Sequence, residues 1–386
     1  MKVEKIEAFP VRVPYKRIEA SSLINRGGIT DVLIKLTADN GLVGWGECTR
    51  AADTVGIESA VRAMTPVIIG RDPWDKEAIH RDLAVYGVWA FQPMTGNFAF
   101  AGIDMALWDL CGKACGQPLY RLFGGAMRED VDYFYYMEWA TPDDIARQAS
   151  DGVEKGYSVY YIKVGVDEAK EEEMLEALRQ TIGPTGKIRI DVNQVWSLPQ
   201  AARILKRWHD RFDLDFVEAP VRIDPVENML DLRRMVAVPF CVNEGLWREA
   251  DAWRLIKSRC GEYLCFSPYW VGSMGRFHAL VQASHLEGWQ VCKHTHGELG
   301  LTAVACQHLM LAAPNACLGH QQTAQLIGDD ILTEPVPIAD KPRWGRIEKP
   351  GLGVTVDEDK VARYAESFRK HGDFPTYSGK IARLAS

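Results

Sequence analysis

The chain has 386 residues, of which 47% are apolar and 25% charged, so it can bury a large core and form a barrel-sized domain with a smaller one beside it. Its formal net charge of −7 and its lack of a basic cluster argue against nucleic-acid binding, and no apolar run is long enough to cross a membrane. Nine scattered cysteines predict reduced thiols in a cytoplasmic protein.

The first part of the chain predicts strands followed by helices. Residues 31–37 and 42–47 are β-rich runs on either side of Asn40-Gly41, a pair typical of a hairpin turn. Residues 98–115 carry apolar side chains at helical spacing and end in a Gly-Gln-Pro stop. We therefore expect an α+β domain over residues 1–125.

From about residue 131, strand and helix patterns alternate. The apolar runs close on polar residues at intervals of 23 to 28, near Glu138, Lys163, Asp191, Glu218, Glu244, Ser267, His294 and His320. Eight such units predict an α/β fold, a parallel (β/α)8-like barrel over residues 126–330 with its chemistry at the carboxyl rim. The Pro- and Gly-containing segment 331–386 predicts an extended tail that returns to the first domain.

Three of these strand ends are acids at near-even spacing. Asp191, Glu218 and Glu244 lie 27 and 26 residues apart, about one strand-plus-helix unit. On successive parallel strands, three hard oxygen ligands would converge and bind one Mg²⁺-like cation. Such a cation can stabilise the enolate that forms when a carbon acid loses its proton.

Several motifs, in this order and spacing, resemble the enolase superfamily in its mandelate racemase/muconate lactonizing enzyme branch. The matching segments are GLVGWGE at 41–47, AGIDMALWDLCGK at 101–113, DVNQ at 191–194, EAP at 218–220, NE at 243–244 and PGLGV at 350–354. The resemblance implies a (β/α)7β barrel under a capping domain that the tail completes. It also implies one Mg²⁺, a small carboxylate substrate and a homo-oligomer, either a dimer or an octamer.

Lys163 ends the run before Asp191 and is expected on the neighbouring strand. Beside a cation in a partly dry pocket, its pKa should be lowered, which makes a neutral amine available as a base. Many family members carry Lys-x-Lys here with the second lysine as the base, whereas this chain has Gly165 at that position. Lys163 is therefore the base, an electrophile that contacts the substrate carboxylate, or a group that tunes a neighbouring pKa. Asn193 is expected to add a polar contact to the substrate site.

The seventh strand end carries Lys293, His294 and His296. Side chains alternate along a strand, so only one of Lys293 and His294 can point into the barrel directly. We favour His294 as the catalytic partner of Lys163, with His296 as second choice and with Lys293 and His296 as substrate contacts. A histidine that only bonds a backbone carbonyl is the alternative for either imidazole. Racemase-like members carry an aspartate near Ser267 to orient such a histidine, and serine cannot raise imidazole basicity in the same way.

The remaining rim residues predict substrate contacts. His320 stands where family members often have an acid, and it is expected to donate to the substrate carboxylate instead. Trp139 and Trp270, together with Trp196 and Trp247, follow strand ends and predict an aromatic mouth suited to a flat, apolar or cationic group. The alternative is that these indoles pack helices or a subunit interface.

The leading hypothesis is a Mg²⁺-dependent enzyme that abstracts the α-proton of a carboxylate, with dehydration of a hydroxy or sugar acid favoured. A racemase, epimerase or cycloisomerase is the first alternative, although Gly165 and Ser267 argue against a base on each face of the substrate. A metal-binding barrel without catalysis and a Zn²⁺ hydrolase built on His294 and His296 are the others.

Overall fold

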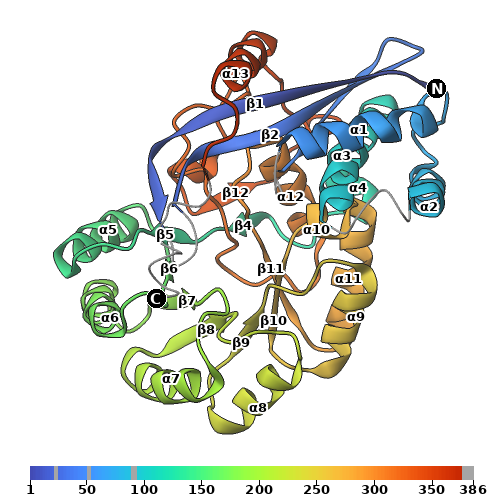
Figure 1. The fold of residues 1–386 in the computed structure, drawn as a ribbon. Helices are drawn as coiled ribbons and strands as arrows, with labels where there is room; N and C mark the ends of the chain where they lie inside the picture. The colour runs from blue at the N-terminus through green and yellow to red at the C-terminus, as the bar shows by residue number, and fades with distance from the viewer. Residues whose placement is uncertain (21–24, 50–53, 88–93, 376–386) are drawn as a thin grey trace.

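The structure, a computed structural model, describes residues 1–386 except 21–24, 50–53, 88–93 and 376–386. An antiparallel sheet with its helices lies against one end of a barrel of parallel strands (Figure 1). Over the residues described, no helix is both long enough and apolar enough to cross a membrane.

The N-terminal unit is a three-stranded antiparallel sheet with helices packed on it. Its elements are β1 (Val3–Ala20), β2 (Asn25–Ala38), β3 (Val43–Cys48), α1 (Thr54–Ile68), α2 (Lys76–Gly87), α3 (Thr95–Cys115) and α4 (Leu119–Leu122). The predicted hairpin joins β2 to β3, with Gly41 at a φ of 83° that glycine adopts without strain. Helix α3 packs so closely on β3 that a Cβ on Gly46 would lie 2.0 Å from the carbonyl oxygen of Gly102. Glycine at both positions therefore lets the helix and the hairpin meet.

The barrel sheet contains seven parallel strands in the order β11-β10-β9-β8-β7-β6-β5. Its strands are β5 (Tyr135–Met137), β6 (Val159–Lys163), β7 (Lys187–Asp191), β8 (Leu214–Glu218), β9 (Phe240–Val242), β10 (Tyr263–Phe266) and β11 (Gln290–Lys293). Its helices are α5 (Pro142–Glu154), α6 (Glu168–Ile182), α7 (Leu198–Phe212), α8 (Glu227–Met235), α9 (Glu249–Ser258), α10 (Pro268–Val271), α11 (Met274–Leu286) and α12 (Gly300–Ala312). The α/β fold and the parallel barrel are as predicted.

The expected eighth strand is an irregular segment, residues 315–321. It closes the barrel by bonding both neighbours: Gln321 N–H donates to the Lys293 carbonyl at 2.9 Å, and His320 N–H donates to the Asp132 carbonyl at 2.8 Å. Arg189 donates to the carbonyls of Leu318 and Gly319 at 2.8 and 2.7 Å, so those oxygens are not free for a regular strand ladder. A side chain from across the barrel thus replaces part of the expected backbone pairing.

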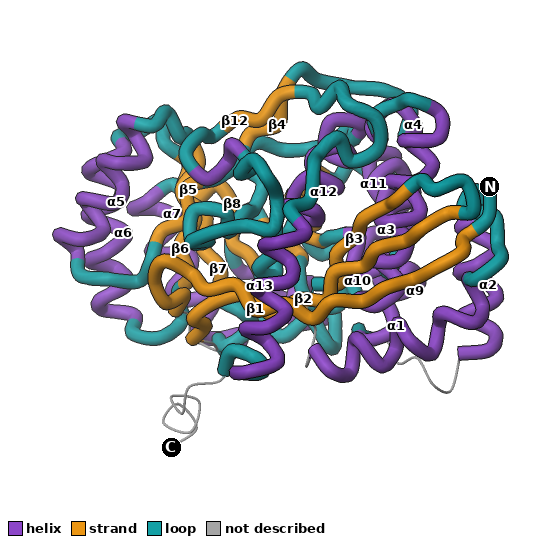
Figure 2. Tube along the Cα trace, turned by 90° about the horizontal axis from the view of Figure 1, so that it is seen from above, coloured by secondary structure: helices purple, strands orange, loops and turns teal. Residues whose placement is uncertain are grey.

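The tail returns to the N-terminal unit. It contains a 3₁₀ turn (Pro337–Ala339), β12 (Arg343–Gly345), which pairs with β4 (Asp130–Asp132), and α13 (Glu358–His371). Seen from above, α13 lies beside β1 (Figure 2). The backbone N–H of Leu352 donates to Asp109 on α3 at 2.8 Å, which fixes the tail to the core of the N-terminal unit.

Candidate active site

A pocket of about 360 Å³ lies between the carboxyl ends of the barrel strands and the N-terminal unit. It is lined by Glu19, Arg26, Met94, Phe134, Tyr136, Tyr161, Lys163, Asp191, Asn193, Asn243, Glu244, Trp247, Trp270, His294, Thr295, His296, Gln321 and Thr323. Most of the residues singled out in the sequence therefore share one cavity.

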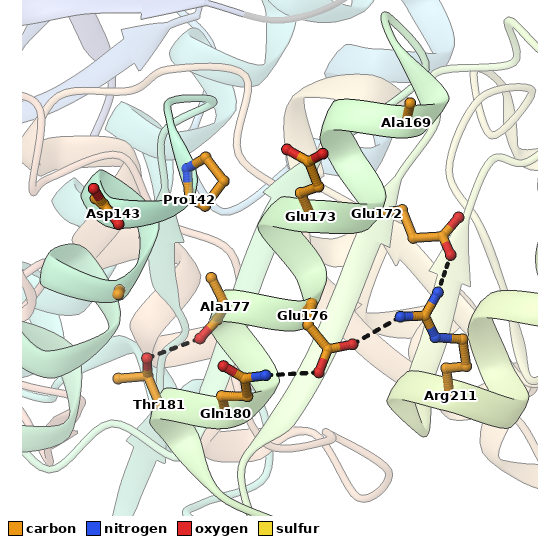
Figure 3. Close-up of a pocket in the computed structure, with 11 residues that line it drawn as sticks. Pro142, Asp143, Ala169, Glu172, Glu173, Glu176, Ala177, Gln180, Thr181 and Arg211 are labelled. Atoms are coloured by element: carbon orange, nitrogen blue, oxygen red, sulfur yellow. Dashed lines mark hydrogen bonds and ion pairs between the residues drawn. The ribbon is translucent and has the colours of Figure 1, made fainter.

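A larger hollow of about 690 Å³ lies on the outside of the barrel, along α5, α6 and α7 (Figure 3). Its Glu176 accepts from Arg211 at 2.8 Å and from Gln180 at 2.9 Å. These are pairs between surface helices, remote from the strand ends, so the hollow carries no chemistry.

The strand register places Lys163 and the first two acids side by side. Lys163 pairs with Asp191 across β6 and β7, and Asp191 pairs with Glu218 across β7 and β8. The Lys163 ammonium donates to Asp191 Oδ2 at 2.6 Å and to Asn193 Oδ1 at 3.0 Å. Asn193 links the set further, because its N–H donates to Asp191 Oδ1 at 2.9 Å and its Nδ2 to Glu244 Oε1 at 3.4 Å.

Burial and mutual repulsion govern the protonation of these acids. Burial, followed by the charge of Asp191, raises the pKa of Glu218 well above its ordinary value and that of Glu244 to about 7. Burial opposes the charged form of Lys163, but the Asp191 carboxylate outweighs it and raises the Lys163 pKa. The lowered Lys163 pKa expected from the sequence applies beside a bound cation and stays a prediction.

The residues present fit a hard divalent cation. Asp191 and Glu218 are almost fully buried, at 2% and 1% exposed, and the Glu244 Oε2 atom is buried without a hydrogen-bond partner in the described part of the chain. Asn193 donates to Asp191 from its backbone N–H and to Glu244 from its side-chain Nδ2, which holds two of the acids beside one another. An oxygen-only set of buried carboxylates that raise one another's pKa is stabilised by a positive charge, and Mg²⁺ prefers such ligands.

His294 lines the pocket from β11, while Lys163 enters from β6. Its Nδ1 lies 3.1 Å from the Tyr269 hydroxyl, and its ring lies 4.4 Å from that of Trp270. Burial, followed by the charges of His296, Lys163 and Lys293, lowers its pKa well below the ordinary value. The imidazole is therefore neutral at neutral pH.

Aromatic side chains form one wall of the pocket. Of the four indoles predicted at its mouth, two line it. Trp270 and Trp247 line the pocket with ring centroids 4.5 Å apart. Trp139 instead donates from Nε1 to Glu171 at 3.4 Å, and Trp196 packs on Trp208, so neither is among the pocket residues. These two indoles follow the alternative that Trp packs helices.

Two further predicted contacts are not brought to the pocket. Lys293 is fully buried on the face opposite His294, in an ion pair with Glu298, as strand alternation requires. His320 accepts the N–H of Lys293 at its Nδ1 (2.8 Å) and lies behind the pocket. The adjacent Gln321 takes the expected place and donates to Glu218 at 2.6 Å. Because segment 315–321 is irregular, the prediction was one residue out of register.

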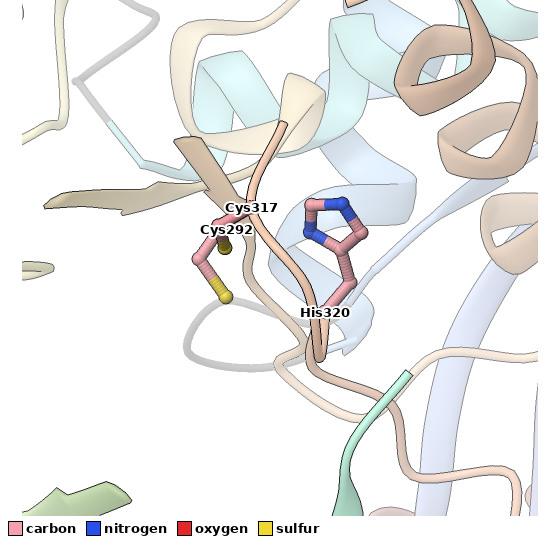
Figure 4. Close-up of side chains that lie close together, drawn as sticks. All are labelled: Cys292, Cys317 and His320. Atoms are coloured by element: carbon pink, nitrogen blue, oxygen red, sulfur yellow. The ribbon is translucent and has the colours of Figure 1, made fainter. Parts of the chain in front are cut away.

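His320 belongs to a small cluster in which ligand atoms of Cys292, Cys317 and His320 lie within 4.8 Å of one another (Figure 4). Burial raises the pKa of Cys292, and the contact with Cys292 raises that of Cys317. The charge of Arg189 acts on both thiols, and His320 Nδ1 is already occupied by Lys293. A cation would meet protonated thiols and a fixed positive charge, so we assign this cluster to packing.

Sequence reasoning missed the wall supplied by the N-terminal unit. Arg26 donates to Glu19 at 2.6 Å and to the His296 carbonyl at 2.5 Å, which ties that unit to the loop after β11. No motif surrounds Arg26, and its contact with His296 spans 270 residues. A charged residue in a β-rich run was the one local signal.

Two protein families match the chain in order. Residues 6–124 match the mandelate racemase/muconate lactonizing enzyme N-terminal domain, and residues 144–360 match the enolase C-terminal domain-like family. The chain belongs to the mandelate racemase/muconate lactonizing enzyme branch of the enolase superfamily.

Relatives in this branch are isomerases and lyases. The chain is 25% identical over 377 residues to an N-succinyl-L-Arg/Lys racemase of Bacillus cereus (94% of this chain and 97% of that one). It is 28% identical over 385 residues to a D-galactonate dehydratase family member of Streptomyces bingchenggensis (89% and 91%). In fold it is similar to an enolase from Thermobispora bispora solved with magnesium and formate, with a TM-score of 0.89 and 22% identity over 100% of this chain and 97% of that one. The chain is therefore an enzyme of a branch whose members are isomerases and lyases.

Proposed function

We propose that this enolase-superfamily enzyme removes the α-proton of a small carboxylate substrate and then eliminates a hydroxyl group, as in dehydration of a hydroxy or sugar acid. The supporting observation is the ion pair of Lys163 with buried Asp191 in a pocket that Glu244 and His294 also line, with Glu218 beside Asp191 on the next strand. Asp191, Glu218 and Glu244 would hold one Mg²⁺, which supplies positive charge to the substrate carboxylate and to the developing enolate.

Lys163 is the proposed base, once a cation held by Asp191 offsets the carboxylate charge that raises the Lys163 pKa. Its Nζ contacts Asp191, one of the proposed metal ligands, and its side chain is 14% exposed, so it is open to a substrate bound beside the metal. The same position lets it act as an electrophile. In this proposal His294 contacts the substrate from the β11 side, and the tilted, packed rings of Trp247 and Trp270 exclude water there.

Exchange of α-protons into deuterated solvent, with Mg²⁺, tests this proposal on a panel of hydroxy acids, sugar acids and N-acyl amino acids. We expect exchange followed by formation of a 2-keto acid for at least one hydroxy acid. Lys163→Ala should lower the exchange rate by roughly 10²–10⁴-fold, the usual contribution of a positioned base. The exposed Lys170→Ala is the matched control and should not change it.

Other outcomes select the alternatives. Exchange with inversion but without elimination favours a racemase or epimerase, for which the Bacillus cereus relative is the precedent. Mg²⁺ binding without exchange on any acid favours a barrel without catalysis. The predicted homo-oligomer is checked by light scattering on the same preparation.

A further inference from the structure

The pair formed by Tyr269 and His294 defines which ring nitrogen of His294 carries a proton. Tyr269 lies in α10, directly after β10, and is 1% exposed. Its ring packs on Phe98 of α3 with centroids 5.2 Å apart. The hydroxyl is therefore held in place against His294 from both the barrel and the N-terminal unit.

The Tyr269 hydroxyl has one proton to give, and its hydrogen-bonding neighbours are two atoms of His294, the Ser267 hydroxyl and the backbone of His296. His294 Nδ1 lies at 3.1 Å and the His294 carbonyl oxygen at 3.4 Å. That carbonyl already accepts from Ser267 Oγ at 2.5 Å, and the phenolic oxygen itself accepts from the backbone of His296. Ser267 and His296 both lower the Tyr269 pKa, as donors to the phenolic oxygen do, so the phenol proton is left for His294. Of the two His294 acceptors, Nδ1 is the nearer and the one that Ser267 does not bind, so the phenol proton goes to Nδ1.

We propose that Tyr269 holds His294 in the neutral tautomer that carries its proton on Nε2, so that His294 donates a hydrogen bond to the substrate and takes no proton from it. With Nδ1 turned toward Tyr269, Nε2 is the ring nitrogen left for the pocket. The tautomer that a histidine adopts is set by the bond that its other nitrogen makes.

The surroundings of His294 favour the neutral ring as well. The charged and titratable groups that act on it are His296, Lys163, Lys293 and Arg26, and each of these disfavours an added proton. Ser267, at the end of β10, is a neutral donor to the backbone and not a carboxylate that would favour imidazolium. A neutral imidazole N–H beside a substrate oxygen polarises that oxygen without a net charge.

This inference rests on the proposed function for the identity of the substrate and deepens it. A racemase that uses His294 as a second base needs a lone pair on Nε2, which the Nε2–H tautomer lacks. Proton removal is then left to Lys163, whose ammonium returns that proton to the departing hydroxyl so that water leaves, while the His294 N–H binds an oxygen of the substrate. Tyr269 is a positioning residue in this scheme.

Nitrogen-15 NMR of histidine-labelled, Mg²⁺-saturated protein tests the inference, with the His294 signals assigned from His294→Asn. We expect a neutral His294 with its proton on Nε2 at pH 7. Tyr269→Phe should shift the population toward the Nδ1–H form or a mixture of the two. Tyr160→Phe is the matched control, because it removes another buried hydroxyl, which donates to the Tyr157 carbonyl at 3.1 Å, and it should leave His294 unchanged.

A proton on Nδ1 of wild-type His294 at pH 7 overturns the inference, as does an unchanged tautomer in folded Tyr269→Phe. Should Tyr269→Phe fail to fold, the wild-type spectrum decides alone: Nε2–H supports the inference and Nδ1–H overturns it. The NMR measurement needs no substrate. Absence of α-proton exchange would therefore contradict the proposed reaction without affecting the result for the His294 tautomer.

Discussion

The carboxylates of Asp191 and Glu244 and the ammonium of Lys163 line the pocket, with the buried Glu218 on the strand next to Asp191. Asp191 is neutralised by Lys163, whereas Glu244 keeps one buried oxygen without a hydrogen-bond partner among the described residues. Burial of such a charge is costly unless it is paired or bound to a metal. These acids together favour binding of a dication, which none of them would bind alone.

Glu244→Gln should weaken Mg²⁺ binding by at least about tenfold, or about 1.4 kcal/mol, because it replaces an anionic oxygen ligand by a neutral one. Isothermal titration calorimetry measures the dissociation constant directly. Glu173→Gln, an exposed acid on α6, is the matched control and should leave affinity unchanged. Equal affinities for Glu244→Gln and the wild type would remove Glu244 from the metal site.

At the residue scale, the sequence predicts side chains that follow a repeated signal and misses those that depend on long-range contacts. Lys163 and the three acids close successive strands, so their common edge follows from the repeat. Arg26 does not, because its place depends on the loop after β11. Tyr269 likewise gains significance only when α10 turns it toward His294.

Among the elements, α3 does more than support the hairpin. Asn97 on this helix donates to the carbonyls of Trp247 and Trp270 at 2.8 and 2.6 Å. These are the backbones of the two pocket indoles: Trp247 lies in the loop after β9, and Trp270 lies in α10. One side-chain amide therefore fixes the aromatic wall from the N-terminal unit.

Asn97→Ala should lower the free energy of unfolding by about 1–3 kcal/mol, because two partly buried carbonyls lose their donor. It should also raise KM more than it lowers kcat, since the indoles position substrate and do not react. Urea unfolding and steady-state kinetics measure the two effects. Asn228→Ala, which removes a bond to the exposed Arg222 carbonyl, is the control. An equal effect of the two substitutions would contradict a role for Asn97 in holding Trp247 and Trp270.

His308 on α12 joins three segments as a neutral ring. Its Nδ1 accepts from the Tyr120 N–H of α4 at 3.3 Å, and its Nε2 donates to the Leu352 carbonyl of the tail at 3.1 Å. Burial lowers its pKa to about 4 from the 6.5 expected in the unfolded chain. The unfolded chain therefore takes up the proton first as the pH falls.

Because the unfolded chain binds this proton more tightly, the free energy of unfolding should fall by about 3 kcal/mol as the pH drops from above 6.5 to about 4. Above pH 6.5 His308 is neutral in both states and causes no such loss. Urea unfolding at several pH values should show a flatter pH dependence for His308→Gln than for the wild type. His285→Gln, at an exposed histidine, serves as the control and should retain the wild-type slope. Parallel curves for wild type and His308→Gln would show that another group controls acid sensitivity.

Across the whole molecule, Asp109 joins the N-terminal helix, the hairpin and the tail. It accepts from Trp45 N–H at 2.9 Å, Leu352 N–H at 2.8 Å and the Lys113 ammonium at 2.7 Å. Asp109→Ala leaves two buried N–H groups and one cation without their acceptor, so we expect a loss of about 3–5 kcal/mol in unfolding free energy. Asp210→Ala, at an exposed position of α7, is the control, and a loss below about 1 kcal/mol for Asp109→Ala would contradict this role.

The fold as a whole was the more predictable part. Seven βα repeats and the Asn-Gly hairpin follow from local patterns, and β6, β7 and β8 end on the predicted residues. The predicted eighth strand is irregular, and there Arg189 of β7 donates to the carbonyls of Leu318 and Gly319. Arg189 is distant in the sequence, so no local pattern at 315–321 indicates these bonds.

The cavity is shared between the N-terminal unit, which supplies Glu19, Arg26 and Met94, and the barrel, which supplies the reactive groups. Glu19 and Arg26 are bonded to each other, and Arg26 is bonded to the His296 carbonyl, so Met94 is the one of these three positions that can change without disturbing the loop after β11. Natural or laboratory evolution therefore has a route to new substrates here: a library confined to Met94 should yield altered preference at little cost in turnover.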